Sequence, residues 1–185
     1  MGARSRSRSR CRGRCSVHDA TCRSQFLRRH IASFSERMCT RGGVTYVRMC
    51  KPVQDLRGEV WAELTTPREV TVGGGATYLI DVRLWHGESL ERSTELVLHR
   101  GSANEGQALI FNWPRAGNRG RIIVSRMLGM SLMYDPSVHG FARYADELVV
   151  HHRCEQHRHS LLSNLEIVRR GPHAAHHNRT RPRRR

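Results

Sequence analysis

The chain has 185 residues and a formal net charge of +16, with 32 Lys and Arg against 16 Asp and Glu. One domain with tails is expected at this length, and no apolar run approaches the length of a membrane span. No apolar secretory signal region is present either, so the six cysteines do not by themselves imply disulfides.

The charge is divided unevenly along the chain. Residues 1–50 carry twelve Arg against two acids, a net charge of +10, and residues 151–185 carry nine Arg against two acids, a net charge of +7. Residues 51–150 carry eleven basic residues against twelve acids, a net charge of −1. Ends so basic repel compaction and attract polyanions, of which nucleic acid is the usual one. An acidic membrane surface is the competing partner.

The first fourteen residues form a low-complexity Arg-Ser tract, predicted to be disordered on its own. Because a guanidinium pairs with phosphate through two parallel hydrogen bonds, the arginines of both ends are the predicted nucleic-acid-binding residues. They are Arg4, Arg6, Arg8, Arg10, Arg12, Arg14, Arg181, Arg183, Arg184 and Arg185. A solvated tail without a specific partner is the alternative. The run Arg181-Pro182-Arg183-Arg184-Arg185 also predicts nuclear localisation.

Cysteine and histidine gather near the N-terminus in the spacing C-x3-C-x2-H-x3-C, formed by Cys11, Cys15, His18 and Cys22. Three thiolates and an imidazole can satisfy tetrahedral zinc, and the spacing is close to that of zinc knuckles that grip single strands. Three incidental thiols in an Arg-rich tail are the favoured alternative. No cofactor is therefore expected, with zinc the one candidate.

A second group lies near the end of the chain and comprises His151, His152, Cys154, His157 and His159. Imidazole and thiolate groups suit metal ligation, and histidine also senses protons near neutral pH. Histidine-rich runs are more often simply exposed. The sequence leaves these three interpretations open.

Residues 77–100 are predicted to organise the fold as a hairpin. Tyr78, Ile80, Val82 and Leu84 alternate with other residues, a period of two that predicts a strand with one buried face. Residues 94–99 predict the second strand. The preceding triplet at residues 73–75 is Gly-Gly-Gly, and because a strand rather than a helix follows, it indicates a turn rather than a phosphate cradle.

Further elements follow from pattern along the chain. A short basic amphipathic helix is predicted over residues 25–38, and helices over residues 141–153 and 161–168. The methionine- and leucine-rich residues 127–133 indicate core packing rather than a cofactor site. Additional strands are predicted over residues 44–50, 59–64, 69–72, 107–113 and 121–125.

These elements predict the fold class α+β, a small antiparallel sheet followed by C-terminal helices and flanked by disordered Arg-rich tails. The predicted organisation is a basic Arg-, Ser- and Cys-rich arm over residues 1–43, a core over residues 44–168 and a basic tail over residues 169–185.

The stretch Gly74 to Leu84, GGATYLIDVRL, resembles the opening strand of the symptom-determinant protein of plant geminivirus betasatellites. The resemblance covers roughly residues 73–150, with a longer loop before Gly120. It continues through Glu95-Leu96, Arg100, Ala103, Phe111, Gly120, Ile122-Ile123, Leu132-Met133-Tyr134-Asp135 and an acidic helix around Asp146 and Glu147.

This resemblance implies a non-enzymatic viral pathogenicity factor that suppresses host RNA silencing. It implies binding of DNA or RNA with little sequence preference, self-association into a homo-oligomer, and action in the host nucleus and also the host cytoplasm. Host regulatory proteins are implied partners. Leu79-Ile80-Asp81-Val82 would fit a motif that docks as an added strand on ubiquitin-like proteins. An ordinary buried strand is the favoured alternative.

Two other functions compete with this one. A viral coat or nucleoprotein would use the same Arg-rich arm on its genome, although a jelly roll takes about eight strands and fewer are predicted here. An enzyme is not expected, because no nucleophile elbow, paired carboxylates or strong metal motif is present. Asp81, His86 and His99 are the residues that the fold would have to bring together for catalysis.

Overall fold

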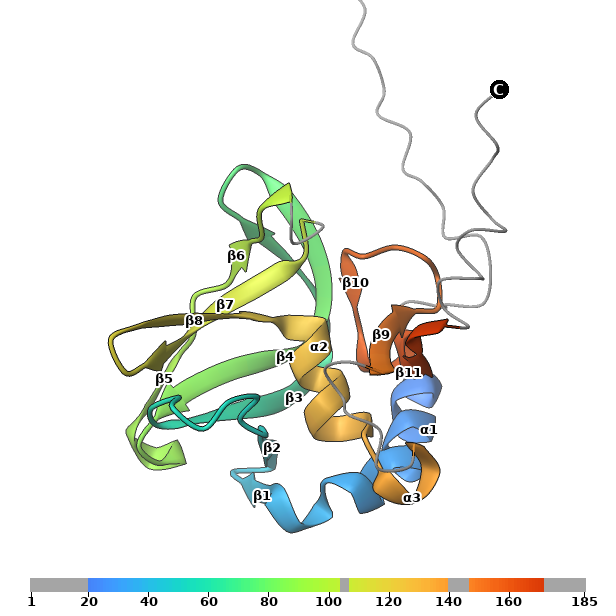
Figure 1. Ribbon diagram of the computed structural model, residues 1–185. Coiled ribbons are helices and arrows are strands. Elements are labelled where there is room, and N and C mark those ends of the chain that lie inside the picture. Colours follow the sequence, from blue (N-terminus) through green and yellow to red (C-terminus); the bar gives the residue numbers. More distant parts are fainter. Residues whose placement is uncertain (1–19, 104–106, 140–146, 172–185) are drawn as a thin grey trace, which may run out of the picture.

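The computed structural model describes residues 20–103, 107–139 and 147–171, and strands dominate it (Figure 1). The largest sheet has the order β1-β2-β3-β4-β10, with β5 also paired to β4. Its strands are β1 (Met38–Arg41), β2 (Val44–Arg48), β3 (Glu59–Val72), β4 (Ala76–Gly87), β5 (Ser93–Glu95) and β10 (His159–Ser160). From β1 to β4 each strand pairs antiparallel with the next, whereas β10 joins β4 in parallel.

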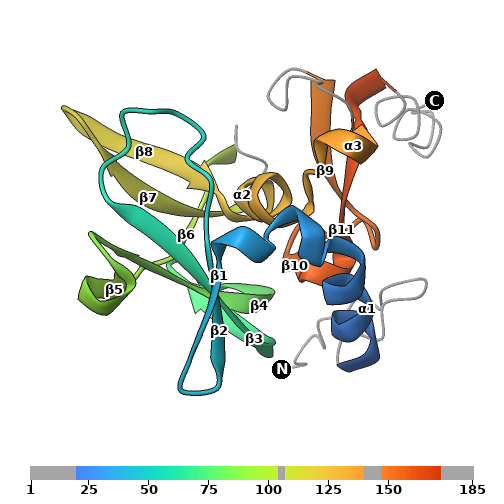
Figure 2. The same ribbon diagram turned by 90° about the horizontal axis from the view of Figure 1, so that it is seen from below.

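Two smaller sheets complete the β structure. One has the order β6-β7-β8 and the other pairs β9 with β11. Their strands are β6 (His99–Arg100), β7 (Leu109–Arg115), β8 (Asn118–Ile123), β9 (Leu148–His152) and β11 (Leu165–Arg169). Figures 1 and 2 both place β5, β7 and β8 on one side of the molecule and α1, β9 and β11 on the other, with α2 between them.

The helices are short. The α-helices are α1 (Ala20–His30), α2 (Val124–Leu128) and α3 (Pro136–His139); a π-helix, η5 (Gly129–Met133), continues α2; and 3₁₀ turns occur at η1 (Ile31–Ser33), η2 (Ser35–Arg37), η3 (Leu90–Arg92) and η6 (Leu162–Asn164). The predicted core packing of residues 127–133 is confirmed, since Met127, Leu128, Leu132 and Met133 are at most 2% exposed.

The predicted buried face of β4 is confirmed. Tyr78, Ile80, Val82 and Leu84 are each at most 1% exposed, as the period of two requires. Asp81 on the other face is also buried, at 3%. On this second face the backbone N–H of Leu162, at the start of η6, donates to the Asp81 carboxylate. In addition, β10 pairs with one edge of β4.

The glycine triplet turns β3 into β4, as predicted. Gly74 and Gly75 adopt positive φ angles of 83° and 72°, which glycine adopts without steric cost. The two predicted strands on either side of Pro67 form one strand, β3, whose register shifts between Leu64 and Arg68. Proline lacks an N–H, so an irregularity at this point keeps the strand continuous without that hydrogen bond.

The predicted hairpin over residues 77–100 is present but shorter. Only β5 pairs with β4, through Ser93, Thr94 and Glu95. The predicted second strand is divided, because β6 leaves β4 and pairs with β7 instead. Residues 93–100 therefore contribute to two sheets.

The predicted α+β fold with C-terminal helices is wrong. Leu148–His152 is strand β9, and Leu165–Arg169 is strand β11, which pairs antiparallel with it. Both predictions rested on short apolar runs, which a helix and a buried strand share. Adjacent β-branched residues, Val149-Val150 and Ile167-Val168, favour the extended form once a partner strand is at hand. The molecule is mostly β, with a curled antiparallel sheet.

Part of the predicted N-terminal arm belongs to the folded structure. Residues 20–43 contain α1, η1, η2 and β1. Phe26 and Phe34 are 5% and 1% exposed and lie in the hydrophobic core. Since β1 pairs with β2 residue by residue, the predicted boundary after residue 43 falls inside a hairpin. The predicted basic helix over residues 25–38 is α1 as far as His30, followed by 3₁₀ turns.

Candidate functional site

The predicted nucleic-acid-binding arginines of both tails lie outside the described residues, as does the nuclear-localisation run. Cys11, Cys15 and His18 of the predicted N-terminal zinc site also lie outside them, and Cys22 lies in α1 with its side chain not described. The structure does show where the elements next to the two tails lie. The first element, α1, and the last strand, β11, lie on the same side of the molecule (Figures 1 and 2).

Helix α1 presents basic side chains to solvent on this side. Phe26 anchors the helix in the core, while Arg28 and Arg29 in its last turn are exposed. Neither arginine has an acidic partner among the described residues. Basic groups at a helix C-terminus are favoured by the helix dipole. These two guanidinium groups are therefore exposed on an anchored helix and available to an anion.

The basic residues of the central region, in contrast, are largely neutralised by neighbouring acids. Ion pairs join Lys51 to Glu59 at 3.7 Å and Arg115 to Asp55 at 2.7 Å. Other pairs are Arg68 and Arg83 with Glu95, Arg92 with Glu88, and Arg41 with Glu91. Pairing of this kind lowers the positive potential that a polyanion would meet.

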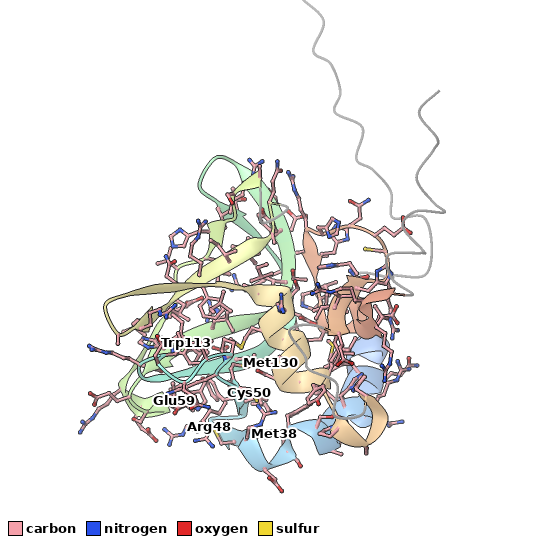
Figure 3. All side chains as sticks on the ribbon, in the orientation of Figure 1. Met38, Arg48, Cys50, Glu59, Trp113 and Met130 are labelled. Carbon is pink, nitrogen blue, oxygen red and sulfur yellow. The ribbon has the colours of Figure 1, made fainter. Side chains whose placement is uncertain are left out.

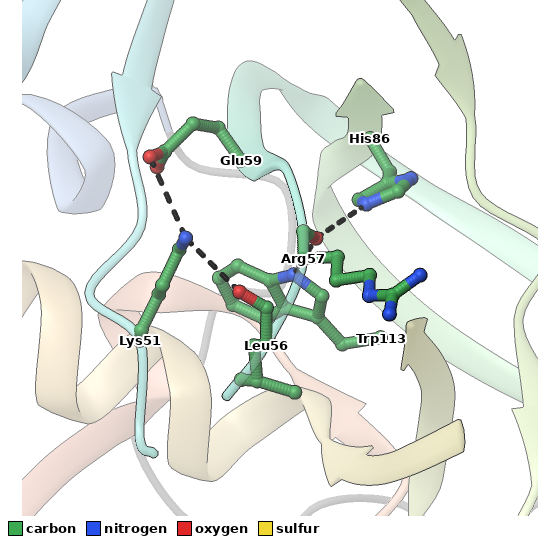
Figure 4. Close-up of polar contacts among 6 residues, drawn as sticks. All are labelled: Lys51, Leu56, Arg57, Glu59, His86 and Trp113. Carbon is green, nitrogen blue, oxygen red and sulfur yellow. Dashed lines mark hydrogen bonds and ion pairs between the residues drawn. The ribbon is translucent and has the colours of Figure 1, made fainter. Parts of the chain in front are cut away.

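Lys51, the only lysine, has a mainly structural setting (Figure 4). Its ammonium donates to the Leu56 carbonyl at 3.1 Å, which steadies the connection between β2 and β3. The next carbonyl, of Arg57, accepts from Trp113 Nε1 at 2.9 Å and lies 3.0 Å from His86 Nε2. This network fastens the β2–β3 connection onto β4 and β7.

Arg37 is likewise a structural residue. Its guanidinium donates to the carbonyls of Ser33, Arg48 and Ser131. The amide of Cys50 also donates to the Ser131 hydroxyl at 2.9 Å. Figure 3 labels Arg48 and Cys50 of this region, together with Met130 of η5. Arg37 thus ties η1 and β2 to η5 and has little capacity left for phosphate.

The segment Leu79-Ile80-Asp81-Val82, which the resemblance suggested as a docking strand, is an interior strand. It pairs with β3 on one edge, and Leu79 and Ile80 pair with β10 on the other. All four residues are at most 7% exposed. Strand addition requires an unpaired edge, so the structure here corresponds to the alternative of an ordinary buried strand.

The three residues considered for catalysis do not meet. Asp81 and His86 are five residues apart on β4, which places them on opposite faces and about 17 Å apart. The Asp81 carboxylate accepts from the Leu162 amide with both oxygens at 3.1 Å. His86 contacts the Arg57 carbonyl, and His99 lies in β6 of another sheet.

The C-terminal histidines and cysteine, in contrast, are brought together by the turn between β9 and β10. The Cys154 sulfur lies 3.5 Å from His159 Nδ1. The rings of His152 and His157 meet edge-on, with centroids 5.3 Å apart. Cys154 is 8% exposed and His152 is 7% exposed. His152 Nε2 is buried without a hydrogen-bond partner.

Burial governs the protonation of this cluster. Desolvation lowers the pKa of His152 to about 3, and the nearby charges of His157, His151 and His159 act in the same direction. Desolvation also lowers the pKa of His159. Protonating His152 would place a positive charge in a desolvated site beside other histidines. The ring is therefore neutral at pH 7, with a lone pair on one nitrogen.

A thiol beside an imidazole can be a nucleophile that the imidazole activates, or the two groups can be ligands of one metal ion. Asn164 donates to the backbone carbonyl of His159 at 2.7 Å, which fixes the backbone that carries the imidazole. The buried sulfur is poorly placed for a substrate. Ligation is the chemistry that this geometry favours.

No family model matches the chain, and neither does any curated protein or solved structure compared with it. The resemblance to the betasatellite protein therefore stays a prediction. Within the described ranges, no helix has the length and apolar character needed to cross a bilayer.

Proposed function

We propose that this protein is a viral pathogenicity factor that binds DNA or RNA without strong sequence preference and suppresses host RNA silencing. The observation that carries the proposal is the division of charge, +10 and +7 at the two ends against −1 in the centre. Phosphate contacts by Arg-rich tails give affinity but carry no base information. Self-association and action in the host nucleus and cytoplasm belong to the same proposal.

Two features of the described residues support this mechanism. The central cations are largely paired with acids, which leaves the excess positive charge to the ends. The first and last elements lie on one side of the molecule, where Arg28 and Arg29 are exposed. Tails that leave from α1 and β11 can therefore contact one nucleic acid together with α1.

The test is fluorescence anisotropy with labelled single- and double-stranded DNA and RNA across a salt series. One full-length variant replaces the six N-terminal arginines from Arg4 to Arg14 with Gln. Its slope of log affinity against log salt on duplex DNA should be shallower by about 5, since each phosphate contact contributes about 0.9. Replacing Arg181, Arg183, Arg184 and Arg185 should reduce the slope by about 3 to 4.

A matched control removes four charges from the centre and its edge through Arg48→Gln, Arg57→Gln, Arg92→Gln and Arg100→Gln. All four side chains are exposed, and the slope should change by less than about 1. An equal loss in this control would show that total charge, not the tails, sets affinity. In leaf tissue with a silenced reporter, the natural chain should restore the signal and the N-terminal variant should not.

A coat or nucleoprotein is the second candidate, and the mostly β body favours it. The order β1-β2-β3-β4 is a meander, however, whereas a jelly roll contains Greek keys. Light scattering of the chain mixed with its nucleic acid separates the two functions. A particle of one defined size supports the coat protein, and a broad range of complexes supports the silencing suppressor.

A further inference from the structure

The turn between β9 and β10 contains a buried polar group that the nucleic-acid function does not use. His152 is 7% exposed, and its Nε2 has no hydrogen-bond partner. A buried polar group left unsatisfied is unfavourable. Such groups are rare in folded proteins, and a bound ion is one explanation for them. The other side chains of the same turn indicate which ion.

The separation between Cys154 and His159 is that of two ligands of one zinc ion. Zinc binds sulfur at about 2.3 Å and imidazole nitrogen at about 2.0–2.1 Å in a tetrahedral arrangement, which puts the two ligand atoms about 3.6 Å apart. The Cys154 sulfur and His159 Nδ1 are 3.5 Å apart.

The two other histidines have a similar relation. Two imidazoles on one tetrahedral zinc have ring centroids about 5 Å apart. The rings of His152 and His157 are 5.3 Å apart and meet at 76°, an edge-on arrangement rather than a stack. Sulfur with imidazole is also the donor set that zinc favours over magnesium or calcium.

The backbone that carries these side chains is fixed. Asn164, fully buried, accepts from the Cys154 amide at 3.0 Å and donates to the His159 carbonyl at 2.7 Å. Two tight turns close the loop, from the Glu155 amide to the His152 carbonyl and from the His159 amide to the Gln156 carbonyl. Ligand-bearing backbone held in this way reduces the entropy cost of binding an ion.

We propose that His152, Cys154, His157 and His159 bind a structural zinc ion. Within the described residues, no three His, Cys, Asp or Glu side chains already converge on one ion. Zinc binding therefore requires side-chain rotation that brings the Cys154–His159 pair and the His152–His157 pair onto one ion. The exposed His157 has room for such a rotation. The ion would fasten the small β9–β11 sheet to β10 and so to the large sheet. This proposal is independent of nucleic-acid binding.

The experiment uses the full chain with Cys11→Ser, Cys15→Ser and Cys22→Ser, so that the N-terminal thiols cannot supply the metal site. Mass spectrometry of the native protein counts Zn²⁺, and titration with Co²⁺ reports thiolate ligation through the sulfur-to-cobalt charge-transfer band. We expect one zinc per chain and a strong band. Absence of both in this background would overturn the proposal.

In the same background, Cys154→Ser should abolish the band, and Cys39→Ser, at an exposed cysteine, should preserve it. His157→Asn provides a test that does not depend on the core, because this side chain is exposed. Loss of a group that only supports a ligand typically weakens metal affinity by about 10- to 100-fold. Because His157 is proposed as a ligand itself, its replacement should weaken Zn²⁺ affinity by more than this. A band that survives Cys154→Ser, or unchanged affinity in folded His157→Asn, would contradict the site.

Discussion

Asp81 on β4 and His152 on β9 are both buried polar side chains, but their surroundings differ. Both oxygens of the Asp81 carboxylate accept from the Leu162 amide. His152 Nε2 has no partner among the described residues. A satisfied buried polar group is compatible with a stable fold, whereas an unsatisfied one costs free energy. The Asp81 contact is therefore structural, and His152 is the residue on which the zinc proposal rests.

The difference extends to the regions around them. On the β3–β4 side, Arg68 and Arg83 pair with Glu95. The α1–β9 side also has ion pairs, Arg153 with Glu166 and Arg169 with Glu147. What sets this side apart is its histidines, because desolvation first and nearby cations second lower the pKa of His30 to about 4 and that of His152 to about 3. The stability of the α1–β9 side should therefore depend on pH and on added metal. The stability of the β3–β4 side should change mainly when its buried side chains are replaced.

The largest effect is expected from the hydrocarbon core of β4. Ile80 is fully buried, so Ile80→Ala should lower the free energy of unfolding by about 2–5 kcal/mol through lost burial and a cavity. Urea denaturation measures the loss. Ile80→Val is the matched control and should cost only about 0.5–1.5 kcal/mol. Equal losses for both would mean that β4 does not organise the core.

The satisfied carboxylate should matter next. Asp81→Ala leaves the Leu162 amide unpaired in the interior and should cost about 1–3 kcal/mol in urea denaturation. Asp81→Asn keeps one acceptor oxygen and should cost less. If Asp81→Ala left the free energy of unfolding unchanged, the Asp81 carboxylate would contribute no more to the fold than His152 Nε2 does. That outcome would contradict the difference between the two residues.

Acid should destabilise the α1–β9 side. His30 has its pKa lowered to about 4 by burial first, then by Arg29, Arg153 and His139, with Asp135 opposing. The unfolded chain therefore binds the proton more tightly than the folded one. Stability should be complete above pH 6.5 and decline as pH falls towards 4. The contribution of His30 to this loss should be about 1 kcal/mol, because His30 is only half buried and solvent screens its charge. His152 should add to the loss in the same direction.

Thermal or urea unfolding between pH 7.5 and pH 4 measures this decline. His30→Gln should reduce the slope over this range, and His99→Gln, at an exposed histidine of β6, should leave it unchanged. A slope unaffected by His30→Gln would assign the acid sensitivity to another group.

The smallest effect is expected at the surface. Asp55 and Arg115 meet at 2.7 Å but are 38% and 43% exposed. A double-mutant cycle with Asp55→Asn and Arg115→Gln should give a coupling of about 0.2–1 kcal/mol that weakens in salt. A coupling above about 2 kcal/mol would show that the central ion pairs support the fold as well as neutralise it.

Prediction from sequence succeeded where the pattern was local. The alternation around Ile80 gave the strand and its buried face, and the glycine triplet gave the turn. It failed over Leu148–His152 and over residues 165–168, where parts of the predicted helices are instead strands β9 and β11. That pairing joins residues distant in the sequence, and short apolar runs do not distinguish a helix from a buried strand.

The candidate sites divide in the same way. The sequence by itself determined the division of charge, since counting arginines requires no fold, and it also determined the presence of His152, Cys154, His157 and His159. Only the tertiary structure decided that Cys154 faces His159 and that His152 Nε2 is buried unpartnered, or that Asp81 receives the Leu162 amide. Burial and partnership depend on how distant segments pack, and no local pattern records them.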